Sequence, residues 1–84
     1  YKPMELQKFI ENFADQFENT DLSIIKPETR FIDLDEWSSL QVLAIIAMAD
    51  IEYNVKIKAD DIRKCSTIND LYQMVKSKIN NDNV

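Results

Sequence analysis

Few side chains in this sequence could do chemistry, and two adjacent serines are the most informative of them. Ser38 and Ser39 come directly before the apolar run that begins at Leu40. A serine in the first turn of a helix can hold a phosphate, because free backbone amides and the positive end of the helix dipole both favour an anion there. A serine pair at this place is more often a simple helix cap, so the pattern by itself leaves both interpretations open.

Other residue types offer little for catalysis or metal binding. Cys65 is the only cysteine and the chain has no histidine, which excludes an internal disulfide, a thiolate metal cluster and a catalytic imidazole. We expect Cys65 to be a small, half-buried apolar residue. Asp33, Asp35 and Glu36 lack the glycine and the downstream glutamate of a calcium-binding loop. We therefore predict no metal site and no catalytic residue, and we interpret these three acids as solvated carboxylates before a helix.

The composition describes a small acidic domain. The 84 residues carry 10 basic and 15 acidic side chains, for a net charge of −5. This balance disfavours nucleic acid, whose binding depends on cations that contact phosphates. The sequence has no signal peptide, lipidation motif or membrane-spanning apolar run, so we expect a cytoplasmic protein without membrane insertion. We also expect a monomer. We predict one domain over residues 1–84, in which residues 1–3 are a cloning remnant or a native extension and residues 80–84 form a frayed tail.

The segment that would position Ser39 is a helix predicted from Leu40 to Tyr53. This run is rich in Leu, Ala and Met and contains neither Pro nor Gly, which favours a helix. The spacing of Ser38 and Gln41 predicts a capping box. In it, the Ser38 oxygen accepts from an amide of the first turn while Gln41 bonds the amide of Ser38.

This central helix carries two apolar faces on nearly opposite sides. A core as small as this one can bury only one of them, so the other is covered by a loop or left open as a docking surface beside Ser39. Trp37 could cap the core or serve as an exposed anchor. The first face consists of Val42, Ile45, Ile46, Ala49 and Tyr53, and the second of Leu40, Leu43, Ala44, Ala47 and Ile51.

Three further helices are predicted from apolar residues at helical spacing. Residues 4–18 form a first amphipathic helix, residues 59–64 a short third helix, and residues 68–79 a last helix. Thr67 caps the last helix, with Asp70 at the third position of a capping box. We therefore predict an all-α fold, a small bundle of three main helices and one short helix.

A long connection separates the first two main helices. It spans residues 19–35 and contains Pro27, which interrupts helical structure. Connections of this length are unusual in compact domains. In the long connection we expect burial of Leu22, Ile24, Ile25, Phe31, Ile32 and Leu34.

A shorter loop follows the central helix. We expect Val55 and Ile57 to point into the core from this loop.

The order of these elements resembles the acyl carrier proteins over almost the whole chain. The resemblance rests on Pro-Glu-Thr-Arg-Phe-Ile-Asp-Leu in the long connection, on Ser-Leu before an apolar helix that ends in Glu-Tyr, and on the later Val-x-Ile and Thr-Ile-x-Asp-Leu. Such families carry 4′-phosphopantetheine on the serine of an Asp-Ser-Leu motif. The matching residues here are Ser39 and Leu40.

The resemblance implies a carrier that performs no reaction itself. It would hold acyl intermediates as thioesters and present them to enzymes of fatty acid or polyketide-type biosynthesis. The implied partners are a phosphopantetheinyl transferase and enzymes that load and process acyl groups, and they would bind Trp37 and the second face of the central helix. The alternative is a carrier-like interaction module that is not phosphopantetheinylated, in which Ser38 and Ser39 only cap the helix.

The sequence departs from the family pattern at four positions. Ser38 and Asp35 stand where the family has an aspartate and a glycine, and Ala44 and Ile51 stand where it tends to have glutamates. The changes at Ala44 and Ile51 imply partner contacts that are more apolar and less sensitive to salt than is usual for the family.

Overall fold

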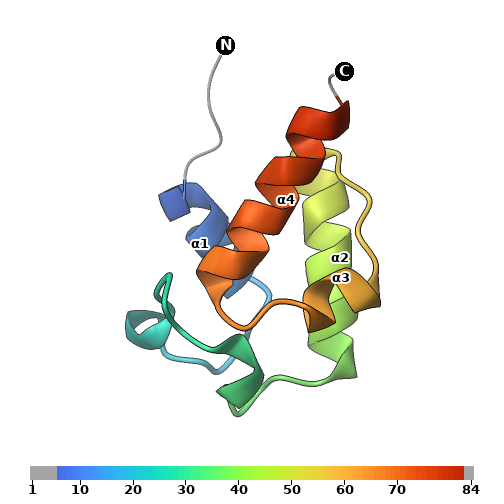
Figure 1. Cartoon of the computed structure of the whole chain (residues 1–84). Coiled ribbons are helices and arrows are strands. Elements are labelled where there is room, and N and C mark those ends of the chain that lie inside the picture. The colour runs from blue at the N-terminus through green and yellow to red at the C-terminus, as the bar shows by residue number, and fades with distance from the viewer. Residues whose placement is uncertain (1–5, 83–84) are drawn as a thin grey trace.

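The structure, a computed structural model, describes residues 6–82 and the side chains of residues 6–79. Within this range the regular structure is helical, as predicted. Figure 1 shows α4 crossing the molecule between α1 and α2, with the long connection gathered at one end of the bundle. The helices are α1 (Leu6–Ala14), α2 (Ser39–Tyr53), α3 (Ala59–Arg63) and α4 (Ile68–Asp82), with short 3₁₀ helices η1 (Leu22–Ile24) and η2 (Phe31–Asp33).

The core lies where the apolar sides of α1, α2 and α4 meet. Val55 and Ile57 are buried at 1% and 5% exposure, which confirms that the loop after α2 points them inward. The amide of the buried Asn12 donates to the Tyr53 hydroxyl at 3.0 Å and links α1 to the last turn of α2. The largest fully buried side chains are Phe9, Phe13, Phe31, Ile45, Val55, Ile62, Ile68, Leu71 and Val75.

Helix α1 ends earlier than the periodicity predicted. It stops at Ala14 rather than Glu18, and the predicted residues Met4 and Glu5 lie outside the described range. The amide of Phe17 donates to the carbonyl of Ala14, three residues earlier, at 3.0 Å. This tight turn lets Phe17 stack on Trp37, with ring centroids 6.3 Å apart. The distant aromatic contact overrides the local helical pattern.

The long connection buries only part of its apolar side chains. Ile25, Phe31 and Leu34 are buried, as expected. The prediction was wrong for three others, because η1 and η2 are single turns whose side chains point in several directions. The exposed residues are Leu22 (65%), Ile24 (49%) and Ile32 (50%).

The same connection closes the start of α4. The amide of Ile68 donates to the carbonyl of Thr29 at 3.1 Å, and the amide of Asn69 donates to that of Pro27 at 2.8 Å. Two of the four amides that a helix start leaves unsatisfied therefore find acceptors in the connection.

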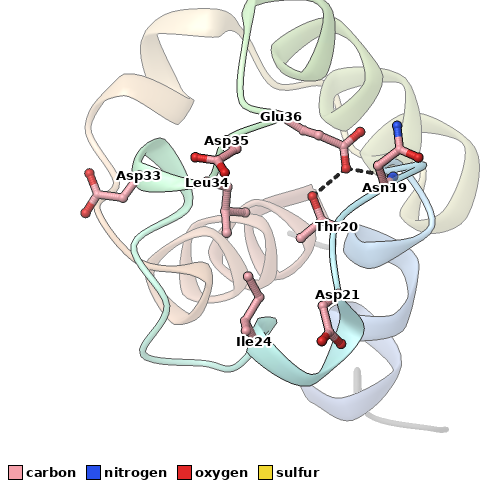
Figure 2. A pocket seen from close by; sticks show the side chains of 8 residues that line it. All are labelled: Asn19, Thr20, Asp21, Ile24, Asp33, Leu34, Asp35 and Glu36. Atoms are coloured by element: carbon pink, nitrogen blue, oxygen red, sulfur yellow. Dashed lines mark hydrogen bonds between the residues drawn. The ribbon is translucent and has the colours of Figure 1, made fainter.

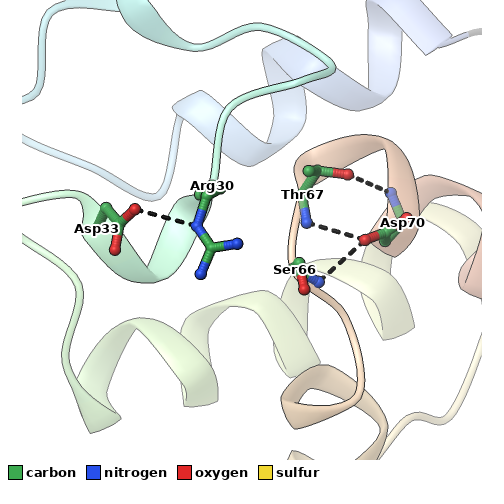
Figure 3. Close-up of polar contacts among 5 residues, drawn as sticks. All are labelled: Arg30, Asp33, Ser66, Thr67 and Asp70. Atoms are coloured by element: carbon green, nitrogen blue, oxygen red, sulfur yellow. Dashed lines mark hydrogen bonds and ion pairs between the residues drawn. The ribbon is translucent and has the colours of Figure 1, made fainter.

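The predicted cap of α4 is confirmed. The Asp70 carboxylate accepts from the amides of Ser66 and Thr67, both at 3.0 Å, and the Asp70 amide donates to the Thr67 hydroxyl at 3.1 Å. Figure 3 shows this reciprocal pair beside Arg30, whose backbone forms an isolated antiparallel bridge with Thr67. The hydrogen bonds from the backbone amides of Thr67 and Ser66 lower the pKa of the Asp70 carboxyl.

The two chain ends were also assigned from the sequence. Helix α4 continues through Asp82, past residue 80, where we expected the tail to begin. Residues 1–3 and 83–84 lie outside the described range. Across residues 6–82, no helix is long and apolar enough to cross a bilayer.

Candidate functional site

Ser38 caps the start of α2, as predicted. It is extended (φ −158°, ψ 178°), and its hydroxyl accepts from the Leu40 amide at 3.2 Å. The second half of the predicted capping box is wrong. The Gln41 side chain does not accept from the backbone amide of Ser38. It accepts instead from the Ser38 hydroxyl, which donates to Gln41 Oε1 at 2.6 Å. Ser38 therefore uses its hydroxyl both as acceptor and as donor within the cap.

Ser39 is the first residue of α2, and its surroundings differ from those of Ser38. Its side chain is exposed, and its hydroxyl takes part in no hydrogen bond with the described residues. The first turn of α2 contains no acidic residue. An anion attached here would meet the positive end of the helix dipole without a like charge in the same turn. The residues present therefore fit a covalently attached phosphate group.

Trp37 anchors the approach to α2 on the core. Its ring is half-buried and lies 4.7 Å from that of Phe31 and 6.3 Å from that of Phe17, measured between centroids. Its amide donates to the Leu34 carbonyl at 3.0 Å. Of the two roles considered for Trp37, the structure supports the core cap, and a contribution to partner binding stays a prediction.

Glu36 is not the solvated carboxylate that we expected. Its Oε1 accepts from the Asn19 amide at 2.8 Å and from the Thr20 hydroxyl at 2.5 Å, and its Oε2 accepts from the Glu18 amide at 3.2 Å. Figure 2 shows Glu36 reaching toward Asn19 and Thr20. The bond from Thr20 is the main cause that lowers the pKa of the Glu36 carboxyl. No local pattern in the sequence indicates these partners, which lie 16 to 18 residues away.

The other two acids before α2 do remain at the surface. Asp33 pairs with Arg30 at 3.2 Å, with both side chains largely exposed, and Asp35 is exposed. Among the described residues, no group of three or more His, Cys, Asp or Glu side chains could hold a metal ion. A cavity of about 400 Å³ lies on this side of the molecule, lined by Asn19, Thr20, Asp21, Ile24, Asp33, Leu34, Asp35 and Glu36.

The two faces of α2 divide as predicted into a buried and an exposed side. Ile45 and Ala49 of the first face are completely buried. Met48, which we had assigned to neither face, is buried at 3% exposure. On the second face Leu40, Leu43 and Ile51 are 68%, 64% and 77% exposed.

The second face is called the exposed apolar face below, and it consists of Leu40, Leu43, Ala44, Ala47 and Ile51. Ala47 is exposed and Ala44 is half-buried. Residues 39–49 of α2 contain no charged side chain. The first acid, Asp50, is paired with Lys56 at 2.7 Å. An apolar surface therefore runs from Leu40 along α2.

Cys65 has the structural role that we expected. It is half-buried, and its thiol donates to the Asp61 carbonyl at 3.5 Å. Burial raises the pKa of this thiol, which makes it a poor nucleophile at neutral pH.

Comparison with known proteins gives the class of the molecule. The family model described as the phosphopantetheine attachment site matches residues 7–75. Acyl carrier proteins of Rickettsia canadensis and Rickettsia rickettsii are each 33% identical to this chain over 72 residues, which cover 86% of this chain and 83% of theirs. The acyl carrier protein of Rickettsia typhi is 31% identical over the same length. No solved structure matches significantly.

The matched region covers most of the fold and defines a domain that bears phosphopantetheine. The chain belongs to the acyl carrier protein family, whose members are carriers and not enzymes. Its cofactor is 4′-phosphopantetheine, attached covalently. This group supplies a thiol at the end of a long arm, where an acyl group can be held as a thioester.

Proposed function

We propose that Ser39 carries the 4′-phosphopantetheine, and that the chain presents acyl intermediates to enzymes of fatty acid or polyketide-type biosynthesis. The observation that carries the proposal is the exposed Ser39 hydroxyl, which has no hydrogen-bond partner among the described residues. The neighbouring Ser38 hydroxyl is occupied by Leu40 and Gln41. Ser39 is therefore the serine of this pair whose oxygen is free to become a phosphate ester.

The first turn of α2 supports the charge of that ester. The positive end of the helix dipole favours an anion there, and the nearest acid within the helix is Asp50, three turns away and paired with Lys56. The role of the chain is thus to hold and display the group, while partner enzymes supply the reactions.

The exposed apolar face and Trp37 are proposed to bind these partners. Three large aliphatic side chains lie exposed on one side of α2, and the face begins at the residue after Ser39. A partner that covers Leu40, Leu43 and Ile51 would remove apolar area from water beside the modified serine. Because residues 39–49 carry no charge, we expect this binding to depend only weakly on salt.

The test is the intact mass of the protein after incubation with coenzyme A and a broad-specificity phosphopantetheinyl transferase. We expect one phosphopantetheine adduct on the wild type and on Ser38→Ala, and none on Ser39→Ala. Ser38→Ala loses a helix cap, at a cost of about 1 kcal/mol of stability. It thereby controls for disturbance of the α2 start without loss of the Ser39 hydroxyl.

Two results would contradict the proposal. An adduct that survives in Ser39→Ala would place the site elsewhere. A folded wild type that takes no adduct from several transferases would favour the unmodified interaction module. For the cargo, the intact mass of loaded protein purified from its own cells would separate fatty acyl from polyketide intermediates.

A further inference from the structure

Glu36 joins two parts of the chain that are far apart in sequence. Its carboxylate receives three hydrogen bonds from residues 18–20, in the connection that begins after α1 ends at Ala14. Glu36 itself lies three residues before Ser39. The contact therefore connects the first part of the long connection to the approach of α2.

The donors form a site suited to a carboxylate. The amides of Glu18 and Asn19 have no backbone acceptor among the described residues, and the Glu36 carboxylate accepts from both. The Thr20 hydroxyl adds a third donor to the same carboxylate. Hydrogen bonds to an ionised acceptor are stronger than those between neutral groups. The two oxygens of the Glu36 carboxylate together accept from all three donors.

An aromatic contact lies next to these bonds. Phe17 precedes Glu18 and Trp37 follows Glu36, and their rings stack with planes 24° apart. Two consecutive residues, 36 and 37, are thus fixed to four consecutive residues, 17–20. We call this set of contacts the Glu36 clasp.

The clasp and the cap together determine where Ser39 lies. Residues 36 and 37 are held by the clasp, and Ser38 is held by its bonds to Leu40 and Gln41. The Ser39 hydroxyl has no bond of its own to the described residues, so its position depends on these neighbours. We propose that Glu36 is a positioning residue for Ser39, and that its carboxylate holds the approach of α2 so that a transferase meets the Ser39 hydroxyl in one place. This inference rests on the proposed function, in which Ser39 is the modified serine.

The direct test compares Glu36→Gln with Asp35→Asn in the transferase reaction. Glutamine keeps the size of the side chain but has one uncharged acceptor oxygen for three donors. Asp35 is the adjacent exposed carboxylate and has no hydrogen bond to the described residues, so Asp35→Asn makes the same charge change without loss of the clasp. We expect kcat to fall about tenfold in Glu36→Gln with KM within about twofold, because misplacement of a reacting group lowers the rate of the chemical step. Asp35→Asn should match the wild type.

A second pair of variants removes a single bond of the clasp. Thr20→Ala deletes one donor, whereas Thr20→Ser keeps the hydroxyl. We expect a smaller loss of kcat in Thr20→Ala and recovery in Thr20→Ser. Amide hydrogen exchange at Trp37 and Leu40, whose amides donate to the Leu34 carbonyl and the Ser38 hydroxyl, should quicken in Glu36→Gln and Thr20→Ala but not in the two controls. Circular dichroism would establish that each variant is folded.

The outcomes separate this inference from the proposed function. A wild type that is modified at Ser39, with Glu36→Gln and Asp35→Asn equal in kcat, would overturn the positioning role alone. Equal kcat values in Thr20→Ala and Thr20→Ser would overturn it as well, even if Glu36→Gln failed to fold. A wild type without any adduct would instead remove the proposed function on which the inference rests.

Discussion

The starts of α4 and α2 differ in how the unsatisfied backbone amides of a helix start are capped. At α4 the first amides are satisfied within the chain, by carbonyls of the long connection and by the Thr67 hydroxyl. An acid of the first turn, Asp70, completes the cap. At α2 the cap is limited to Ser38, the first turn has no acid, and the Ser39 hydroxyl is exposed.

This difference between the two helix starts indicates that the start of α4 serves the fold and the start of α2 serves the proposed attachment site. Each helix start offers unsatisfied amides and positive potential. At the start of α4 the amides and the positive potential both help to hold the long connection in place. At the start of α2 the Ser38 side chain accepts from the Leu40 amide, no acid lies in the first turn, and the Ser39 hydroxyl is exposed. A phosphate ester can therefore be added there without the loss of a structural contact.

The largest predicted effect concerns the connection that closes α4. Phe31 is fully buried and contacts Trp37 and Phe13. We expect Phe31→Ala to lower the free energy of unfolding by about 3–5 kcal/mol, as is typical for loss of a buried phenyl ring. Urea unfolding followed by circular dichroism would measure this change.

Ile32→Ala is the matched control for that variant, because Ile32 is the next residue and is 50% exposed. Its unfolding free energy should stay within about 0.5 kcal/mol of the wild type. Equal losses in the two variants would show that the connection is not anchored by Phe31.

A smaller effect should follow from opening the α4 cap alone. Thr67→Ala removes the hydroxyl that accepts from the Asp70 amide, and loss of such a cap costs about 1 kcal/mol. The side chain of Ser66 is exposed and forms no hydrogen bond with the described residues, so Ser66→Ala serves as control. Both variants should accept phosphopantetheine at the wild-type rate. Slower loading in Thr67→Ala alone would mean that the two helix starts are not independent.

The smallest effect on stability is expected on the exposed apolar face of α2. Leu43→Ala should leave the unfolding free energy within about 0.5 kcal/mol of the wild type. It should nevertheless raise the KM of the transferase about threefold to tenfold, because interface leucines contribute through the apolar area that they bury. Leu22→Ala is a matched control, since Leu22 is 65% exposed and Leu43 is 64% exposed. An equal KM in the two variants would argue against docking on α2.

Local patterns in the sequence predict much of the fold and the position of the candidate site. The helix period identified α2 and its two faces, and the spacing of Thr67 and Asp70 identified the cap of α4. These features depend on residues within one or two turns of each other, which a sequence displays directly.

Features that depend on distant partners were not predictable in the same way. The early end of α1 follows from the contact of Phe17 with Trp37, and the role of Glu36 follows from donors in residues 18–20. The exposure of Leu22, Ile24 and Ile32 depends on how η1 and η2 turn over the bundle. Hydropathy alone assigns such residues to the core, since it carries no information on which side of a short turn faces inward.

The most direct measurement is the location of the adduct on the loaded wild-type protein. Fragmentation mass spectrometry can distinguish Ser38 from Ser39, because cleavage between the two residues separates their masses. We predict phosphopantetheine on Ser39 only, with Ser38 unmodified. An adduct on Ser38, whose hydroxyl is occupied by the α2 cap, would contradict the claim that the open start of α2 is the attachment site.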